Sequence, residues 1–124
     1  QQALTKAEIN PSDISFINTH GTGTENNDLI ESIAMKRLFG TVPLFASTKS
    51  NIGHTLGAAS AIEAAFSIFS IIQQEVYVHL NFKEGIAETG LLPVNAYQQR
   101  PIKHVMSNSF GFGGNCSSLI FSKV

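Results

Sequence analysis

Two histidines occupy positions suited to chemistry, because each follows a predicted β-strand. His20 comes directly after the strand-like run 14–18, and His54 follows a second run at 42–47 and a short turn. In an open α/β sheet, ligands bind beyond the carboxyl ends of the strands, so we expect both imidazoles at one rim. A glycine-rich turn at 110–114 follows a third predicted strand. Three such loops at one rim predict a binding or catalytic site.

Each of these signals is weak when it is taken alone. A single histidine at a strand end is more often a structural hydrogen-bonding group, and the turn at 110–114 alone favours a glycine-rich hairpin. A metal site is not supported, because no Cys, Asp or second His lies at short ligand spacing from either histidine. Residues 20–24 also lack the glycine spacing and the lysine of a nucleotide-binding loop.

The elements that must position these groups alternate between strands and helices. The runs 14–18 and 42–47 predict the first two strands, and 104–108 and 117–121 predict two more. Strand, helix, strand, helix and two final strands indicate an α/β fold with a mixed, mostly parallel sheet, helices on both faces and an antiparallel edge. Residues 1–8 resemble the end of a helix. Residues 50–53 predict a turn, and residues 81–97 predict an irregular connection.

The first predicted helix lies between the first two strands. Apolar residues recur at helical spacing from 29 to 39, and Gly40 stands where a helix C-terminal glycine belongs. Asp28 is expected as the N-cap or as a first-turn acid, with Glu31 in the capping-box position.

A second helix, expected from about Leu56 to Gln74, is the strongest single clue to the fold. Apolar side chains cover every face of it, so we expect it to be buried between two layers. Glu63 is its only charged residue, and we expect Lys49 or nearby backbone donors to pair with this carboxylate. The alternative places Glu63 on a thin polar strip that faces solvent. The segment is expected to be too short and too polar to span a membrane.

Composition indicates one folded domain with covered surfaces. The 124 residues are 43% hydrophobic and 14% charged, against roughly a quarter charged in an average domain, so much of the surface is expected to be covered by another domain or chain. A net charge of −1 without a basic cluster argues against nucleic-acid binding. The single cysteine, Cys116, excludes an internal disulfide and fits a reducing compartment, which we expect to be the cytoplasm. Because Gln1 is not an initiator methionine, the chain is expected to begin within a larger gene product.

Three motifs together resemble those of the β-ketoacyl-[acyl-carrier-protein] synthases, condensing enzymes of the thiolase-like superfamily. The family's first histidine motif is similar to His20-Gly21-Thr22-Gly23-Thr24 with Asn27, Asp28 and Glu31. Its Lys/second-histidine motif is similar to residues 47–59, which contain Lys49 and His54, together with Glu63. Its C-terminal Phe/Gly turn is similar to Asn-Ser-Phe-Gly-Phe-Gly-Gly-Asn at 108–115. The motifs occur in family order and span nearly the whole chain.

The resemblance implies that residues 1–124 are the C-terminal repeat of a thiolase-like fold, without the N-terminal half that carries the nucleophilic cysteine. The implied activity is that of a 3-oxoacyl-[acyl-carrier-protein] synthase, an acyltransferase of fatty-acid or polyketide biosynthesis. Such an enzyme condenses an acyl thioester with malonyl-carrier-protein by decarboxylative Claisen chemistry. This chain alone is expected to be inactive, and Cys116 is expected to act as a small hydrophobic residue rather than as the nucleophile.

The resemblance also implies a role for each site residue. His20 and His54 would hold the malonyl thioester carbonyl and promote decarboxylation, and Lys49 would tune the electrostatics around them. Thr22 and Thr24 would bind the pantetheine arm. The substrate-contacting turn would comprise Phe110, Gly111, Phe112 and Gly113, where Phe112 supplies an oxyanion-hole N–H and an aromatic gate. The structural carboxylates would be Asp28, Glu31 and Glu63, and an ion site built partly from such carboxylates stays open.

The implied partners are an acyl carrier protein, the N-terminal half of the synthase and a second copy of the full enzyme, with no membrane partner. No metal and no cofactor of the chain's own are expected, because the phosphopantetheine is carried by the carrier protein. The alternative is a non-catalytic partner subunit resembling chain-length factors. His79 and His104 match no motif and are expected to be ordinary strand or loop residues.

Overall fold

The computed structural model describes the whole chain, from Gln1 to Val124. In chain order its elements are α1 (Gln2–Ala7), the 3-10 turn η1 (Pro11–Asp13), β1 (Phe16–Asn18), α2 (Glu25–Phe39), β2 (Leu44–Ala46), α3 (Lys49–Ile52), η2 (Leu56–Ala58), α4 (Ala59–Gln73), β3 (Glu75–Val76), β4 (Gln98–Gln99), β5 (His104–Phe110), η3 (Phe112–Gly114) and β6 (Cys116–Ser122).

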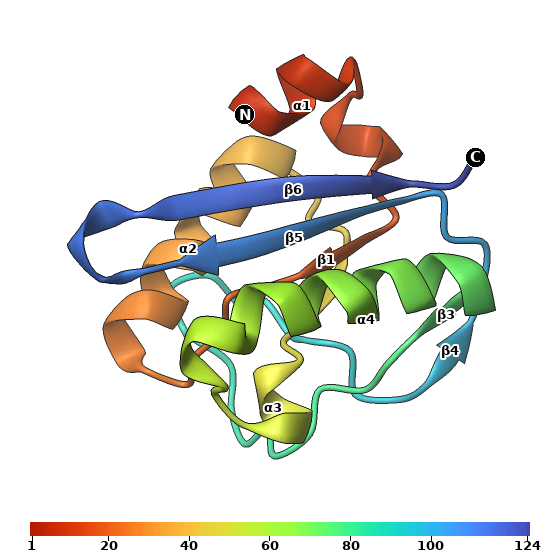
Figure 1. The fold of residues 1–124 in the computed structure, drawn as a ribbon. Helices are drawn as coiled ribbons and strands as arrows, with labels where there is room; N and C mark the ends of the chain where they lie inside the picture. Colours follow the sequence, from red (N-terminus) through yellow and green to blue (C-terminus); the bar gives the residue numbers. More distant parts are fainter.

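The main sheet has four strands in the order β2-β1-β5-β6. β1 pairs in parallel with β2 and with β5, while β6 runs antiparallel to β5 at the edge, which confirms the predicted mixed sheet (Figure 1). β3 and β4 form a separate antiparallel pair. β5 runs two residues beyond the predicted strand 104–108, so Ser109 belongs to it, and so does Phe110, which was expected in the glycine-rich turn 110–114.

Helices cover both faces of this sheet, as the sequence predicts. Because successive side chains of a strand point to opposite faces, Phe16 and Ile17 of β1 lie in different clusters. Phe16 packs in the cluster that includes Ile71 of α4, and Ile17 packs with Leu4 of α1 and Met35 of α2. Figure 1 shows α4 alone along one side of the sheet and α1 and α2 on the other.

The prediction that helix α4 is buried on every face is wrong for this chain. Its polar residues face the sheet: Glu63 is 2% exposed and Ser67 is fully buried. Ile71 is buried with them, but other large apolar residues face outward, with Phe69 55% exposed and Ile72 65% exposed. Small side chains on the inner face let α4 approach β5 closely. No other part of the 124 residues covers the outward apolar face of α4.

Two further predictions need correction. Residues 50–53 do not form a simple turn, because Gly53 N–H donates to the carbonyl of Lys49 and closes the single-turn helix α3. Glu31 does not complete a capping box: α2 begins after Thr24 without a side-chain cap, and Asp28 lies in its first turn. Gly40 does end α2, with its N–H bonded to the carbonyl of Lys36.

The segment Leu56–Gln73 is 18 residues long and has a mean hydropathy of 1.5, so by length and composition alone it passes the test for a membrane span. This corrects the prediction that it is too short and too polar. The core helix of a folded domain passes the same test, and the inner face of α4 packs on the sheet.

Candidate active site

His20 lies just beyond the carboxyl end of β1 and is 7% exposed. The carboxylate of Glu31 on α2 fixes its backbone, accepting the N–H of His20 at one oxygen and the N–H of Gly21 at the other, both at 3.0 Å. Asn108 of β5 donates its side-chain amide to the same carboxylate at 3.1 Å. Glu31 therefore ties the start of the histidine loop to α2 and to β5.

Gly21 sits where two strand ends approach each other closely. Its φ is +40°, and a Cβ placed on it would lie 2.6 Å from the Cβ of Ser47, at the end of β2. The Ser47 hydroxyl donates to the Gly21 carbonyl at 2.9 Å. Only glycine satisfies both the backbone angle and the lack of space.

Lys49 carries the charge at the centre of the site. Its ammonium group forms an ion pair with Glu63 of α4, and it also donates to the His20 carbonyl at 2.8 Å. The side chains of Lys49 and Glu63 are 6% and 2% exposed, respectively. The predicted Lys49–Glu63 partnership is thus confirmed, and the alternative of a solvent-facing Glu63 is wrong.

The protonation of His20 follows from its neighbour Lys49. The Lys49 Nζ lies 3.3 Å from Nδ1 of His20, and an ammonium group has only hydrogens to offer, so Nδ1 must be the acceptor. Burial lowers the pKa of His20 to about 4, with Lys49 and His54 adding to the shift and Asp28 opposing it. At neutral pH His20 is therefore uncharged, and Nε2 carries its N–H.

His54 is fixed in the same tautomer by a backbone contact. The N–H of Leu56 donates to Nδ1 of His54 at 3.0 Å, which leaves the proton of the neutral ring on Nε2. Leu56 can reach this nitrogen because its φ is +50°, an uncommon value for a residue with a Cβ. Strained backbone of this kind clusters at functional sites.

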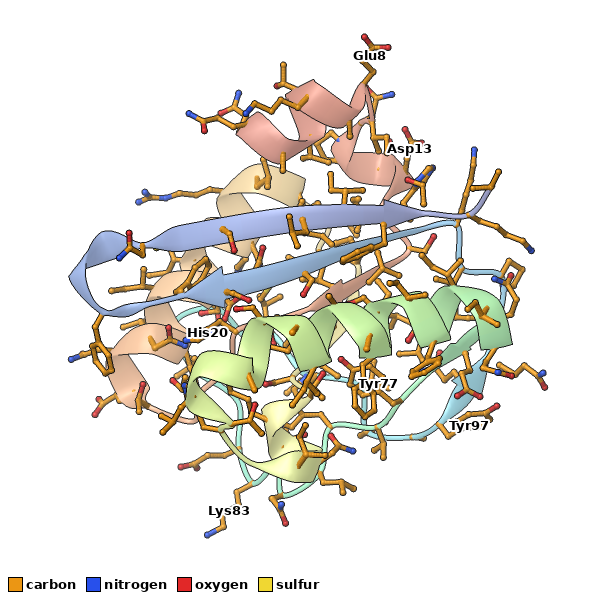
Figure 2. All side chains as sticks on the ribbon, viewed as in Figure 1. Glu8, Asp13, His20, Tyr77, Lys83 and Tyr97 are labelled. Atoms are coloured by element: carbon orange, nitrogen blue, oxygen red, sulfur yellow. The ribbon has the colours of Figure 1, made fainter.

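The two imidazoles and the Phe/Gly turn meet at one cavity, as the sequence predicts. The ring centroids of His20 and His54 are 6.0 Å apart and edge to face, and the Phe110 ring lies 5.4 Å from that of His20. Figure 2 shows His20 beside the carboxyl end of β5 and the first turn of α4. A cavity of about 810 Å³ opens here, and the predicted site residues that line it are His20, Thr22, Thr24, His54, Glu63, Phe110, Gly111 and Phe112.

The predicted substrate-binding residues occupy the open side of this cavity. The hydroxyls of Thr22 and Thr24 lie 2.9 Å apart and are hydrogen-bonded to each other. Phe112 is fully exposed at the tip of the turn, and one bond across the base, from Gly111 N–H to the Asn115 carbonyl at 2.8 Å, closes the loop. Gly113, at φ +78°, gives the turn its left-handed bend.

The sequence missed the residues of β5 that hold the two glutamates. Asn108 donates to Glu31, and the Ser109 hydroxyl donates to the second oxygen of Glu63 at 3.0 Å. The available signal was a pair of adjacent polar residues, Asn108 at the end of the predicted strand 104–108 and Ser109 directly after it, which strand alternation sends to opposite faces.

The other polar residues singled out lie outside the cavity. Asp28 accepts from the amide of Asn27 at 3.0 Å. His79 accepts the N–H of Ser47, and His104 lies 2.8 Å from the Ser122 hydroxyl, as expected of ordinary structural histidines. Cys116 is exposed at the start of β6. No group of three or more His, Cys, Asp or Glu side chains is placed to hold a metal ion.

This arrangement suits the stabilisation of negative charge on a substrate oxygen. Two neutral N–H donors sit side by side at one cavity, with a buried ammonium group behind one of them. Preorganised donors of this kind stabilise an oxyanion or enolate most effectively where water is excluded.

The chain matches one family model and a consistent set of relatives. The model described as beta-ketoacyl synthase, C-terminal domain, matches residues 1–83. The mitochondrial 3-oxoacyl-[acyl-carrier-protein] synthase of Arabidopsis thaliana is 37% identical and covers 99% of this chain, which spans 28% of that protein. The 3-oxoacyl-[acyl-carrier-protein] synthase 2 of Staphylococcus aureus is 40% identical, with coverages of 99% and 31%. The chain thus spans less than a third of the length of these curated relatives.

Solved structures give the same result for the fold. The ishigamide ketosynthase/chain length factor superposes with a TM-score of 0.95 at 34% identity, over 99% of this chain and 31% of that one. A β-ketoacyl synthase from Burkholderia phymatum superposes with a TM-score of 0.88 at 36% identity, with coverages of 98% and 30%. The expected thiolase-like α/β fold is confirmed.

Proposed function

This chain belongs to the β-ketoacyl synthase family, and from that premise we propose that residues 1–124 form part of the C-terminal half of a 3-oxoacyl-[acyl-carrier-protein] synthase. The complete protein would condense an acyl thioester with malonyl-carrier-protein in fatty-acid or polyketide biosynthesis. This half would contribute the two histidines, the lysine and the Phe/Gly turn.

The pairing of His20 and His54 as neutral Nε2–H donors at one cavity carries the proposal. In the decarboxylation step, the bond between C2 and the free carboxylate of the malonyl group breaks and carbon dioxide leaves. The electron pair moves into the thioester, whose carbonyl oxygen becomes an enolate. Two N–H donors aimed at that oxygen stabilise the charge as it develops, and such donors are each worth about 10²–10³ in rate.

Lys49 would act through His20 rather than on the substrate. Its ammonium group holds Nδ1 and the carbonyl of His20, and Glu63 neutralises its charge in the buried interior. Removing either member of the pair leaves an uncompensated buried charge. Lys49 thus fixes both the position and the tautomer of His20.

The second half of the reaction needs the cysteine that we assign to the preceding half of the synthase. The enolate carbon would attack the acyl thioester on that cysteine, form the new carbon–carbon bond and release the thiolate. The N–H of Phe112 would stabilise the tetrahedral oxyanion, and the hydroxyls of Thr22 and Thr24 would hydrogen-bond the pantetheine arm. Cys116 is exposed at the start of an edge strand, so we do not assign it this role.

The partners proposed for the complete protein are an acyl carrier protein, which delivers both thioesters, and a second synthase chain. One similar solved structure contains a type II polyketide-synthase acyl-carrier protein in complex with its ketosynthase. The matched chain of that structure is 34% identical to this one and superposes with a TM-score of 0.93. The exposed apolar face of α4 would pack against the N-terminal half. A reducing compartment such as the cytoplasm would keep the two cysteines as thiols.

A second candidate function is a non-catalytic, chain-length-factor-like subunit. It is supported by matches to ketosynthase and chain-length-factor complexes, including one from Xenorhabdus doucetiae at 40% identity and a TM-score of 0.84. The two candidates differ in whether the preceding half carries the nucleophilic cysteine.

The test is release of carbon dioxide from malonyl-carrier-protein by the full-length protein. We expect His20→Ala and His54→Ala each to lower the rate by about 10²-fold or more. The matched control is His104→Ala, because His104 lies at the far end of β5 and bonds Ser122. If the full-length protein does not decarboxylate malonyl-carrier-protein, the synthase assignment is wrong and the partner-subunit function is favoured.

A further inference from the structure

A closed circuit of contacts links the Phe/Gly turn to the first histidine. His20 bonds Lys49, Lys49 pairs with Glu63, and Glu63 accepts from Ser109. The ring of Phe110, the residue after Ser109, packs against the ring of His20. The base of the turn is therefore connected to His20 both directly and through the ion pair.

Ser109 supplies the one hydrogen bond that Oε2 of Glu63 accepts. Its hydroxyl donates at 3.0 Å, while Oε1 of Glu63 is held by Lys49. Glu63 is 2% exposed, so water does not readily replace a lost donor. This contact fixes the rotation of the carboxylate about its last side-chain bond.

The orientation of the Glu63 carboxylate determines which acceptors the N–H groups of Lys49 can bond. The ammonium group has three N–H donors, and its partners are Oε1 of Glu63, the His20 carbonyl and Nδ1 of His20. A carboxylate freed from Ser109 can turn both oxygens toward Lys49. The ammonium group then moves away from Nδ1, and the proton of His20 is no longer confined to Nε2.

We propose that Ser109 is a positioning residue for the decarboxylation step, whose hydroxyl orients Glu63 so that Lys49 stays bonded to His20. The proposal rests on the function proposed above and adds to it a residue of the cavity wall whose hydroxyl bonds Glu63 and neither histidine. Ser109 acts through two other side chains, so its effect differs from that of a packing residue.

The charged and titratable groups around His20 come from every element packed against it. They are Lys49 of α3, Asp28 and Glu31 of α2, His54 before η2 and Glu63 of α4. Lys49 and His54 lower the pKa of His20 and Asp28 raises it. A retreat of Lys49 therefore moves the pKa of His20 upward.

The kinetic test compares Ser109→Ala with Ser109→Thr, which keeps a hydroxyl, in the full-length synthase. For Ser109→Ala we expect kcat for malonyl decarboxylation to fall about tenfold, with KM and acyl transfer to the cysteine within twofold of wild type. Ser109→Thr should restore most of the rate. Ser122→Ala is the control, because Ser122 lies opposite His104 at the far end of the β5–β6 pair and its hydroxyl bonds His104, away from the cavity. Equal losses in the Ala and Thr variants, or wild-type kinetics in Ser109→Ala, would overturn the proposal.

A second measurement does not depend on activity. Ring ¹⁵N shifts of His20 in the full-length protein report its tautomer and its pKa. We expect a pure Nε2–H state in wild type and in Ser122→Ala, and a mixture of tautomers with a raised pKa in Ser109→Ala. Identical spectra in all three proteins contradict the role of Ser109. A wild-type protein that fails to decarboxylate contradicts the synthase function, while the spectra still decide the role of Ser109.

Discussion

The backbone N–H of Leu56 donates to Nδ1 of His54 at 3.0 Å, and it does so from a left-handed conformation with φ at +50°. Leu56 and His54 thus form one unit, in which the backbone sets the proton position of the ring.

Substitutions at Leu56 separate this backbone contact from the side chain. Leu56→Gly keeps the N–H and relieves the strain, so we expect decarboxylation within about threefold of wild type. Leu56→Pro has no N–H and a φ fixed near −65°, so we expect a loss of about 10²-fold. Thermal unfolding of both variants, followed beside carbon dioxide release, checks that the fold survives. Equal activity in the two variants would show that the contact does not matter.

The ion pair of Lys49 and Glu63 predicts an asymmetric response to substitution. Glu63→Leu leaves a buried ammonium group without its counter-ion, and we expect it to lower the free energy of unfolding by about 3–5 kcal/mol. The double variant Lys49→Met with Glu63→Leu removes both charges and should be more stable than either single variant. Urea denaturation of all four proteins measures this cycle. Additive losses in the double variant would mean that the two side chains do not interact.

Burial of neutral His20 predicts a loss of stability in acid. The pKa of this group is 6.5 in the unfolded chain and about 4 in the folded protein. Between these values the unfolded chain binds a proton that the folded protein does not bind. The free energy of unfolding therefore falls as the pH drops from about 6.5 to about 4, by an amount on the order of 2–3 kcal/mol from this group.

Urea titrations across this pH range, compared with those of His20→Gln, isolate the contribution of His20. The variant lacks the ionisable ring, so its stability should depend less steeply on pH. Parallel curves for the two proteins would exclude His20 as the source of the dependence.

The outward face of α4 predicts that the chain 1–124 associates with itself when it is produced alone. Phe69 and Ile72 are more than half exposed there, and contiguous apolar surface of this kind promotes association. We expect Phe69→Lys with Ile72→Lys to shift the sedimentation profile toward monomer without loss of helical signal. Ile71→Lys is the contrasting variant, because Ile71 is buried against the sheet and its substitution should unfold the chain. A monodisperse, thermally robust wild-type monomer would contradict the prediction.

The sequence predicted those features that local patterns determine. Strand runs that end in polar loops predicted the mostly parallel sheet and the rim where His20 and His54 meet. A single carboxylate on an apolar helix predicted the pairing of Glu63 with Lys49. Each of these depends on residue types within one or two neighbouring elements.

The features that were missed depend on register between distant elements. Asn108 and Ser109 reach Glu31 and Glu63 only because β5 extends to Phe110 and lies between α2 and α4. The orientation of α4 was missed for a related reason. Its apolar residues surround the helix, so the position of the sheet, and not the hydropathy pattern, decides which side faces inward.

His20 is held by contacts from two acidic side chains that belong to helices on opposite faces of the sheet. Glu31 of α2 accepts the backbone N–H of His20. Glu63 of α4 pairs with Lys49, which bonds Nδ1 of the His20 ring. A shift of either helix relative to the strands is therefore transmitted to the imidazole. On gradual warming of the full-length protein, the rate of malonyl decarboxylation should fall before the circular dichroism signal of the helices decreases.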